Sequence, residues 1–173
     1  EVIVMWNAFN FWSRAFECVN RHSDNIVVSN SPASGQLYWN VYQGSNHYSS
    51  SGSTNKLTLG IRHHIVTTVV GATMRSYIDG VLIATKTDGW EPTSMTRSDC
   101  YIGKSSFATD GYLSGEVSSL KLYSGAMTQA DVTVAHQDSL PQSANPTAAP
   151  TAAPTAAPTE APSAAAPTAA PTT

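Results

Sequence analysis

The segment MRSYIDGVLIATK, residues 74–86, constrains the fold more than any other part of this chain. Two runs rich in β-branched and aromatic residues flank Asp79-Gly80, the pair best suited to the two positive φ angles of a type I′ turn. The segment therefore predicts a β-hairpin. Similar short runs, such as VIVMW, RAFECV and NIVVSN, recur along the chain with turn residues between them. About nine such strands predict an all-β protein, a two-sheet antiparallel sandwich.

The run QLYWNVYQ alternates more regularly than the other runs. Leu37, Trp39 and Val41 point to one face of the expected strand. The alternate residues Tyr38, Asn40 and Tyr42 point to the other face. This pattern is typical of a strand with one buried face.

Two regions of the chain are not expected to be strands: a loop and a short helix. Residues 44–55 are rich in Ser, Gly and Asn and are expected to form a loop, followed by a strand over KLTLG, residues 56–60. Only residues 128–137, TQADVTVAHQ, are compatible with a short helix, for which Thr128 is a candidate N-cap.

The end of the chain cannot form a packed core. Pro, Thr and Ala make up all but two of residues 146–173, so apolar burial cannot offset the entropy of ordering them. We therefore expect one domain over residues 1–140 and an extended polyproline II tail over residues 141–173.

The tail repeats Pro-Thr-Ala-Ala with a period of four. On a helix with three residues per turn, this period places successive Thr residues on all sides of the rod, about 12 Å apart. Such a stalk suits dense O-glycosylation, and we expect sugars or neighbouring chains to hold it; the alternative is a bare linker. The expected O-glycosylation sites are Thr147, Thr151, Thr155, Thr159, Ser163, Thr168 and Thr172.

Composition narrows the class of protein. The net charge is −3 and only 12% of residues are charged, which does not suggest a nucleic-acid or anionic-membrane partner. No apolar run is long enough for a transmembrane helix. The chain has no signal peptide or initiator Met, so we expect a processed or partial chain. Its surface residues, mostly Ser, Thr, Asn and Gly, favour an extracellular protein.

Cys18 and Cys100 are too far apart in sequence for a CxxC redox or zinc motif. Both lie in expected strands. Two buried free thiols are one interpretation; if the chain is secreted, a Cys18–Cys100 disulfide is favoured.

Several motifs together resemble the laminin G-like branch of the concanavalin A-like jelly-roll domains, which also include pentraxins. They are LTLGIRHHIVTTVVGATMRSYIDGVLIATKTDG, then SDCYIGKSSFATDGYLSGEVSSLKLYSGAMTQADV, with EVIVMWNAFNFWSRAFECVN fitting the earlier strands. The likeness spans residues 1–137 and implies a jelly-roll sandwich. Ile61 departs from the usual Trp. Family members usually have a further strand before the position of Glu1, so we expect either additional upstream sequence or a neighbouring chain at an open edge.

The fold also hosts glycoside hydrolases, which need paired carboxylates. Glu17, Glu91 and Glu116 each lack an acidic partner two or four residues away. His63 and His64 are adjacent in an expected strand and point to opposite faces, so they are predicted to be packing residues. We expect no catalytic residues and no enzymatic activity.

Two kinds of ligand remain. The resemblance implies possible calcium binding, for which the candidate ligands are Asp24, Asn25 and Asp110, although solvated loop carboxylates are the plainer explanation. Sugar binding is the other, because lectins stack sugar rings on exposed aromatic side chains. The candidates, which ordinary sandwich packing would also explain, are Trp12, Tyr42, Tyr48 and Trp90.

Two functions follow from these features. The first is a non-enzymatic extracellular structural or adhesive glycoprotein that self-associates into a glycan-coated fibril. The alternative is a lectin-like carbohydrate-binding module tethered to a cell surface or wall by its stalk.

Overall fold

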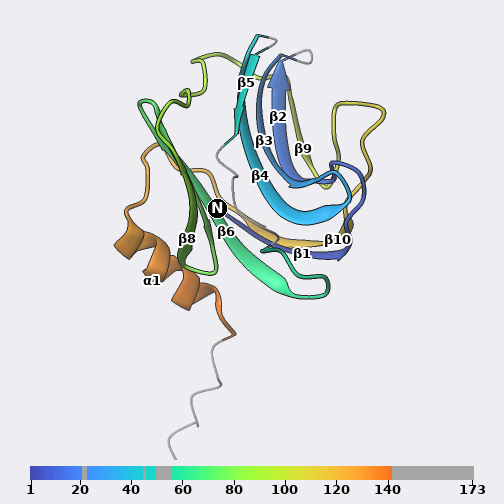
Figure 1. Ribbon diagram of the computed structural model, residues 1–173, viewed down its shortest axis with the longest axis vertical. Coiled ribbons are helices and arrows are strands. Elements are labelled where there is room, and N and C mark those ends of the chain that lie inside the picture. Colours follow the sequence, from blue (N-terminus) through green and yellow to red (C-terminus); the bar gives the residue numbers. More distant parts are fainter. Residues whose placement is uncertain (21–22, 45, 50–55, 142–173) are drawn as a thin grey trace, which may run out of the picture. The chain divides into compact units, whose positions relative to one another are not determined.

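A computed structural model of the chain describes residues 1–20, 23–44, 46–49 and 56–141 (Figure 1). These residues form two antiparallel five-stranded sheets and one helix, which confirms the predicted two-sheet sandwich. None of the helices among them is both long and apolar enough to cross a membrane. Except for Pro141, the predicted stalk lies outside the described residues, so its conformation and glycosylation stay predictions.

Sheet A has the strand order β10-β1-β6-β7-β8. Its strands are β10 (Ser114–Leu120), β1 (Val2–Ala8), β6 (Arg62–Val70), β7 (Thr73–Ile78) and β8 (Val81–Lys86). Strand β1 pairs with both β10 and β6. The first and last strands in the order, β10 and β8, are the edges of this sheet.

Sheet B has the strand order β5-β4-β3-β2-β9. Its strands are β5 (Asn46–Ser49), β4 (Ser34–Gln43), β3 (Ser23–Ser31), β2 (Arg14–Asn20) and β9 (Asp99–Ile102). The strands β2, β3 and β4 follow one another in the chain and lie side by side, so each pair needs only a short turn (Figure 1).

The predicted hairpin is the β7–β8 pair. Asp79 and Gly80 have φ angles of +52° and +80°, and Ile78 pairs with Val81 across the turn. Positive φ at both central positions is the requirement of a type I′ turn, and Gly meets it without steric cost. The Asp79 carboxylate also accepts a hydrogen bond from the His64 N–H at 2.9 Å, which ties the turn to β6.

Two local predictions were wrong. Residues 46–49, expected in a loop, form β5, which pairs with β4. The expected strand at residues 56–60 is an irregular segment in which the Lys56 and Leu57 N–H groups both donate to the Gly35 carbonyl oxygen. Leu57 is nevertheless buried. The alternating apolar residues of this segment therefore reflect one buried side chain, not a pleated strand.

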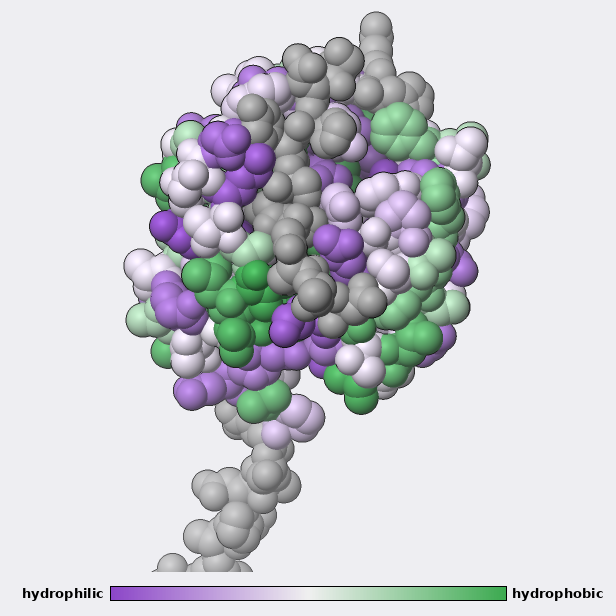
Figure 2. All heavy atoms as spheres, in the orientation of Figure 1, coloured by the Kyte–Doolittle hydropathy of each residue, from purple (hydrophilic) through white to green (hydrophobic). Residues whose placement is uncertain are grey.

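The core lies between the sheets. The inward residues of β4 are those that the alternation predicted, and they pack against residues of β1, β2, β6 and β7. The largest of these core side chains are Trp6, Phe16, Leu37, Trp39, Ile65 and Met74. Elsewhere, hydrophobic residues on the face drawn in Figure 2 form separate patches among hydrophilic ones, as is usual for a globular surface.

A buried chain of hydrogen bonds joins the two sheets. Trp6 Nε1 in β1 donates to Ser13 Oγ at 3.1 Å, and Ser13 Oγ donates to Asn30 Oδ1 in β3 at 2.6 Å. Asn30 Nδ2 in turn donates to the Asn10 and Ser31 carbonyl oxygens. Each polar atom in this chain has a partner, which offsets the cost of burying it.

Helix α1 (Gln129–Ser139) covers part of the outer face of sheet A (Figure 1). As predicted, Thr128 is its N-cap, and Asp131 completes a reciprocal capping box. Val132 of the helix is fully buried and packs with Val66 of β6 and Tyr77 of β7. This small apolar cluster attaches the helix to the sheet.

His63 and His64 point to opposite faces of β6, as expected. On the core side, His63 Nε2 accepts a hydrogen bond from the Thr58 N–H at 3.0 Å, and Nδ1 donates to Asp79 at 2.7 Å. On the outer side, His64 stacks on His136 of α1 with 5.6 Å between ring centroids. Burial lowers the pKa of His64, although the Glu1 carboxylate partly opposes this shift.

Cys18 of β2 and Cys100 of β9 form a disulfide, and their Cα atoms are 4.1 Å apart. The two residues are direct partners in the register of the two strands. The bond therefore fixes the edge strand β9 to the sheet.

Reduction of this disulfide should destabilise the domain. The two cysteines are separated by 82 positions in the sequence, and closing such a loop contributes, on the entropy model, at most roughly 4.5 kcal/mol to the free energy of unfolding. Urea unfolding with and without reductant measures this difference, and a Cys18→Ala/Cys100→Ala variant should show none. Alkylation of both thiols in unfolded, unreduced protein would contradict the disulfide.

The buried His64 should make stability fall in acid. Its pKa is lowered from 6.5 in the folded state. Its contribution to the free energy of unfolding is therefore complete above pH 6.5 and is lost as the pH falls through the lowered pKa. The free energy of unfolding should therefore be smaller at about pH 5.5 than at about pH 7.5. A His64→Phe variant should show a smaller difference between the two conditions. An equal pH dependence in this variant and the original protein would assign the effect to other groups.

Candidate functional site

The outer face of sheet B, which points away from sheet A, carries polar and aromatic side chains from its three central strands. In register, Arg14 pairs with Ser29 and Ser29 with Tyr38, while Val27 lies between Glu17 and Asn40. The outward residues of β4 are those that the alternation predicted. The polar and aromatic residues of this face are Arg14, Glu17, Asn25, Ser29, Tyr38, Asn40 and Tyr42.

A β-bulge in β2 brings Arg14 and Glu17 to the same face. In the pairing with β3, Arg14 is opposite Ser29 and Phe16 is opposite Val28, so Ala15 is the extra residue. Without the bulge, residues three apart in a strand would point to opposite faces.

Arg14 is the centre of a buried ion cluster. Its Nη2 donates to Asp110 Oδ2 at 2.7 Å, and its Nε lies 3.9 Å from Glu17 Oε1. The side chains of Arg14, Glu17 and Asp110 are 6%, 0% and 8% exposed. One guanidinium is therefore shared by two carboxylates in a place that water barely reaches.

The same carboxylates hold the segment 103–113, which follows β9, against this face. Asp110 Oδ2 also accepts a hydrogen bond from Ser105 Oγ at 2.8 Å, and Glu17 Oε2 accepts one from the Ser106 N–H at 2.6 Å. In Figure 1 this segment, drawn in yellow, lies on the side of sheet B away from β6 and β8.

A pocket of about 400 Å³ lies between this segment and the sheet. We call it the aromatic pocket. Trp12 and Tyr38 meet edge to face in it, with 5.0 Å between ring centroids. Trp12 has a positive φ of +49°, a backbone conformation that is uncommon for a bulky residue. The aromatic residues that line the pocket are Phe11, Trp12, Tyr38, Tyr42 and Phe107, and the polar ones are Arg14, Asn40, Thr109 and Asp110.

The charges around Tyr42 act on its phenol. Burial raises the pKa of Tyr42; Arg14 lowers it in part, and Glu17 and Asp110 raise it. The phenol therefore stays protonated and is available as a hydrogen-bond donor or acceptor over the physiological range.

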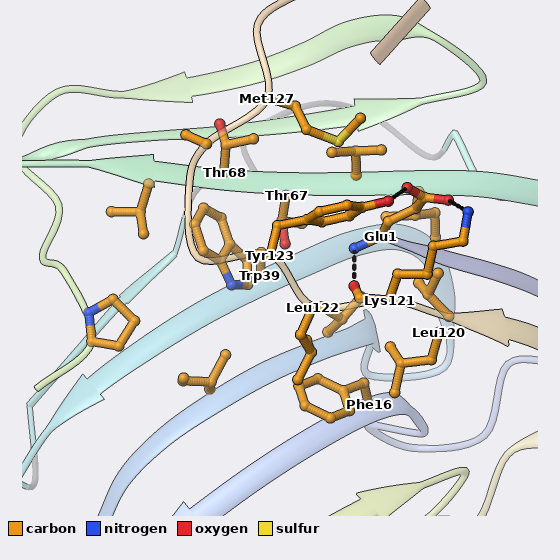
Figure 3. Close-up of a pocket in the computed structure, with 18 of the residues that line it drawn as sticks. Glu1, Phe16, Trp39, Thr67, Thr68, Leu120, Lys121, Leu122, Tyr123 and Met127 are labelled. Carbon is orange, nitrogen blue, oxygen red and sulfur yellow. Dashed lines mark hydrogen bonds and ion pairs between the residues drawn. The ribbon is translucent and has the colours of Figure 1, made fainter. Parts of the chain in front are cut away.

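A second pocket, of about 450 Å³, lies between the two sheets (Figure 3). Its walls include the core residues Phe16 and Trp39 and the segment 120–127. The Glu1 carboxylate, which lines it, accepts hydrogen bonds from Lys121 Nζ at 3.0 Å and from the Tyr123 hydroxyl. Core side chains form much of this pocket, and its carboxylate is already paired.

The structure places two of the four predicted sugar-binding residues together. Trp12 and Tyr42 both line the aromatic pocket. Tyr48 pairs with Val41 through β5, but its side chain is outside the described residues. Trp90 lies between β8 and β9 and does not line the aromatic pocket.

The three predicted calcium ligands have different partners. Asp24 accepts hydrogen bonds from the Gly44 N–H and the Ser23 hydroxyl, and these hydrogen bonds, that of Gly44 foremost, lower its pKa. Asn25 donates to Glu17 at 3.3 Å, and Asp110 binds Arg14. In the part of the chain that the structure describes, no group of three or more His, Cys, Asp or Glu side chains could hold a metal ion. Calcium binding stays a prediction.

Of the remaining residues of the aromatic pocket, sequence reasoning named only Asp110, as a calcium candidate, and missed the others. Tyr38 and Asn40 were predicted to face outward with Tyr42, and this alternation was a signal that could have found them. Arg14 gave no such signal, because the bulge in β2 is not visible in the sequence. Glu17, which looked isolated, shares Arg14 with Asp110, 93 positions later in the chain.

Three comparisons relate the chain to known proteins. A family model described as the concanavalin A-like lectin/glucanases superfamily matches residues 3–133. No curated protein matches the chain. Among solved structures, that of an S-layer domain-containing protein (residues 221–444) from Clostridium thermocellum ATCC 27405 is 21% identical, with a TM-score of 0.40. The match covers 66% of this chain and only 57% of that chain.

Loss of one partner from the ion cluster should destabilise the domain strongly. Asp110→Ala leaves Arg14 buried with one carboxylate fewer, and removing a partner from a buried pair costs about 3 kcal/mol or more. The matched control is Glu116→Ala, which removes an ion pair with Arg62 whose side chains are about half exposed; this change should have almost no effect. Urea unfolding measures both. Equal effects of the two substitutions would contradict a structural role for the buried cluster.

Proposed function

This chain belongs to the concanavalin A-like lectin/glucanases superfamily, and from that premise we propose that it is a non-enzymatic carbohydrate-binding domain, carried outside the cell on a glycosylated stalk. The observation that carries the proposal is the aromatic pocket on sheet B. Five aromatic residues line it, and four polar residues lie among them.

This combination suits a sugar. A pyranose ring has apolar C–H faces that pack on aromatic rings, and its hydroxyl groups need hydrogen-bond partners at the edge of the ring. Trp12 and Tyr38, set nearly at right angles with an interplanar angle of 85°, present two different aromatic surfaces. Arg14, Asn40 and Asp110 bring polar groups to the same pocket.

The carboxylates support binding without hydrolysis. A glycosidase needs two carboxyl groups that reach the scissile bond from either side. Glu17 is completely buried and does not line the aromatic pocket. Asp110 lines it, but one of its oxygens already accepts hydrogen bonds from Arg14 and Ser105.

An extracellular location is supported by two features. A Cys18–Cys100 disulfide persists in an oxidising environment, and the Pro-Thr-Ala-Ala repeat has the composition of O-glycosylated stalks. The proposal therefore includes covalent glycans at the Thr and Ser positions predicted above.

A second candidate is a structural subunit that self-associates into a fibril. One observation favours it: β8 is an edge strand of sheet A, and its residues Val81 and Leu82 are 63% and 43% exposed. Exposed apolar edge strands can pair with another chain.

Glycan-array binding of the full chain tests the first function. Trp12→Ala and Tyr42→Ala should each weaken binding about tenfold or more, because each removes an aromatic surface from the pocket. Trp90→Ala is the matched control, since Trp90 does not line the pocket, and should leave the affinity unchanged. Near-ultraviolet circular dichroism should show that all three variants are folded.

Two outcomes would count against carbohydrate binding. One is equal affinity of the pocket variants and the control. The other is an array without signal for a folded protein. If that protein also sediments as a large assembly, the fibril is the better explanation.

A further inference from the structure

We propose that the aromatic pocket selects neutral sugars over acidic ones, and that Asn40 determines this selectivity by accepting a hydrogen bond from a ligand hydroxyl group. The inference rests on the proposed function and adds the ligand class and the residue that recognises it. It is carried by residues that line the pocket and have a buried polar atom without a hydrogen-bond partner in the protein.

Asn40 is the first of these. It lies in β4 opposite Val27, lines the aromatic pocket and is only 4% exposed. Its Oδ1 is buried and has no hydrogen-bond partner within the protein. Because burying an unpaired amide oxygen is costly, such an atom beside a pocket indicates a ligand that supplies the missing donor.

Arg14 supplies the complementary group. Its Nη1 donates to the Trp12 carbonyl oxygen and its Nη2 to Asp110, whereas its Nε is buried and has no hydrogen-bond partner. Arg14 and Asn40 both line the pocket, so its wall holds one residue with an unpartnered acceptor and one with an unpartnered donor. A hydroxyl group both donates and accepts, so sugar hydroxyls match the polar groups of this wall.

The face of sheet B concentrates such atoms. Among the described residues, eight buried side-chain atoms lack a hydrogen-bond partner, and half of them lie on this one face. They are Arg14 Nε, Asn25 Oδ1, Ser29 Oγ and Asn40 Oδ1. This concentration argues for a polar function of the face, because unpaired atoms are otherwise few and scattered in native proteins.

The charges exclude an acidic ligand. Arg14 is the cation beside the pocket, and it is already paired with Glu17 and Asp110, so the cluster carries one more negative than positive charge. A sugar carboxylate or sulfate would lie beside Asp110 and beside the Asn40 oxygen, and both repel an anion. Neutral hydroxyl groups meet no such penalty.

Binding by isothermal titration calorimetry tests the inference with defined probes. The neutral probes are laminarihexaose, cellohexaose and mannohexaose, and the acidic ones are a hexagalacturonate and a heparin hexasaccharide. We expect binding within the neutral set only, with an affinity that changes little between roughly 0.05 and 0.5 M NaCl, since no ion pair forms with the ligand. Asn40→Ala should weaken that binding about tenfold. Asn7→Ala, at an exposed asparagine of β1, is the matched control and should not.

The outcomes separate this inference from the proposed function. If acidic probes bind more tightly and Trp12→Ala still abolishes binding, the pocket is a sugar site but the inference is wrong. If neutral probes bind equally to Asn40→Ala and Asn7→Ala, Asn40 does not determine selectivity. If no probe binds, or Trp12→Ala changes nothing, the proposed function fails and the inference with it. Should Asn40→Ala not fold, the neutral-to-acidic preference and the salt dependence of the unaltered protein decide.

Discussion

The guanidinium group of Arg14, buried between Glu17 and Asp110, is the interaction on which the candidate site depends. A buried charge without a partner is strongly unfavourable, so Arg14 can lie under the segment 103–113 only with a carboxylate near it, and it has two, of which Asp110 is the closer. The requirement is reciprocal, because Glu17 and Asp110 are equally shielded from water. Their shared cation therefore fixes where the segment crosses sheet B, and with it the shape of the aromatic pocket.

Strand β2 anchors β9 and this segment at three successive points. Cys18 binds Cys100 in β9, Glu17 binds the Ser106 N–H, and Arg14 binds Asp110. As β2 is followed backwards from Cys18 to Arg14, its partners run forwards from residue 100 to residue 110, which continues the antiparallel direction of the β2–β9 pair beyond the end of β9. The disulfide and the two buried polar contacts thus hold this part of the chain beside β2, where a strand would be held by backbone hydrogen bonds.

Local chemistry explains which parts of this structure the sequence could predict. Asp79-Gly80 and the Thr128 N-cap act within a few residues, and the alternation in β4 needs only one buried face, so all three could be predicted from the sequence. The bulge at Ala15 and the partnership of Arg14 with Asp110 depend on contacts between distant segments. Leu57 was predicted to be part of a strand for the same reason. Its conformation depends instead on the burial of its side chain and on the hydrogen bond from its N–H to the distant Gly35 carbonyl oxygen.

The two sheets use their outer faces in opposite ways. On sheet A, the outward residues Val66 and Tyr77 are apolar enough to bury Val132 of α1, and the helix covers part of the face. On sheet B, most outward residues are polar, charged or aromatic, with Val27 lying among them, and a helix with an apolar stripe would leave the polar groups without hydrogen bonds. The irregular segment 103–113 instead supplies the Ser106 N–H to Glu17 and its own Asp110 carboxylate to Arg14. A pocket remains between that segment and the sheet. The position of the site therefore follows from which residues of each sheet face outward.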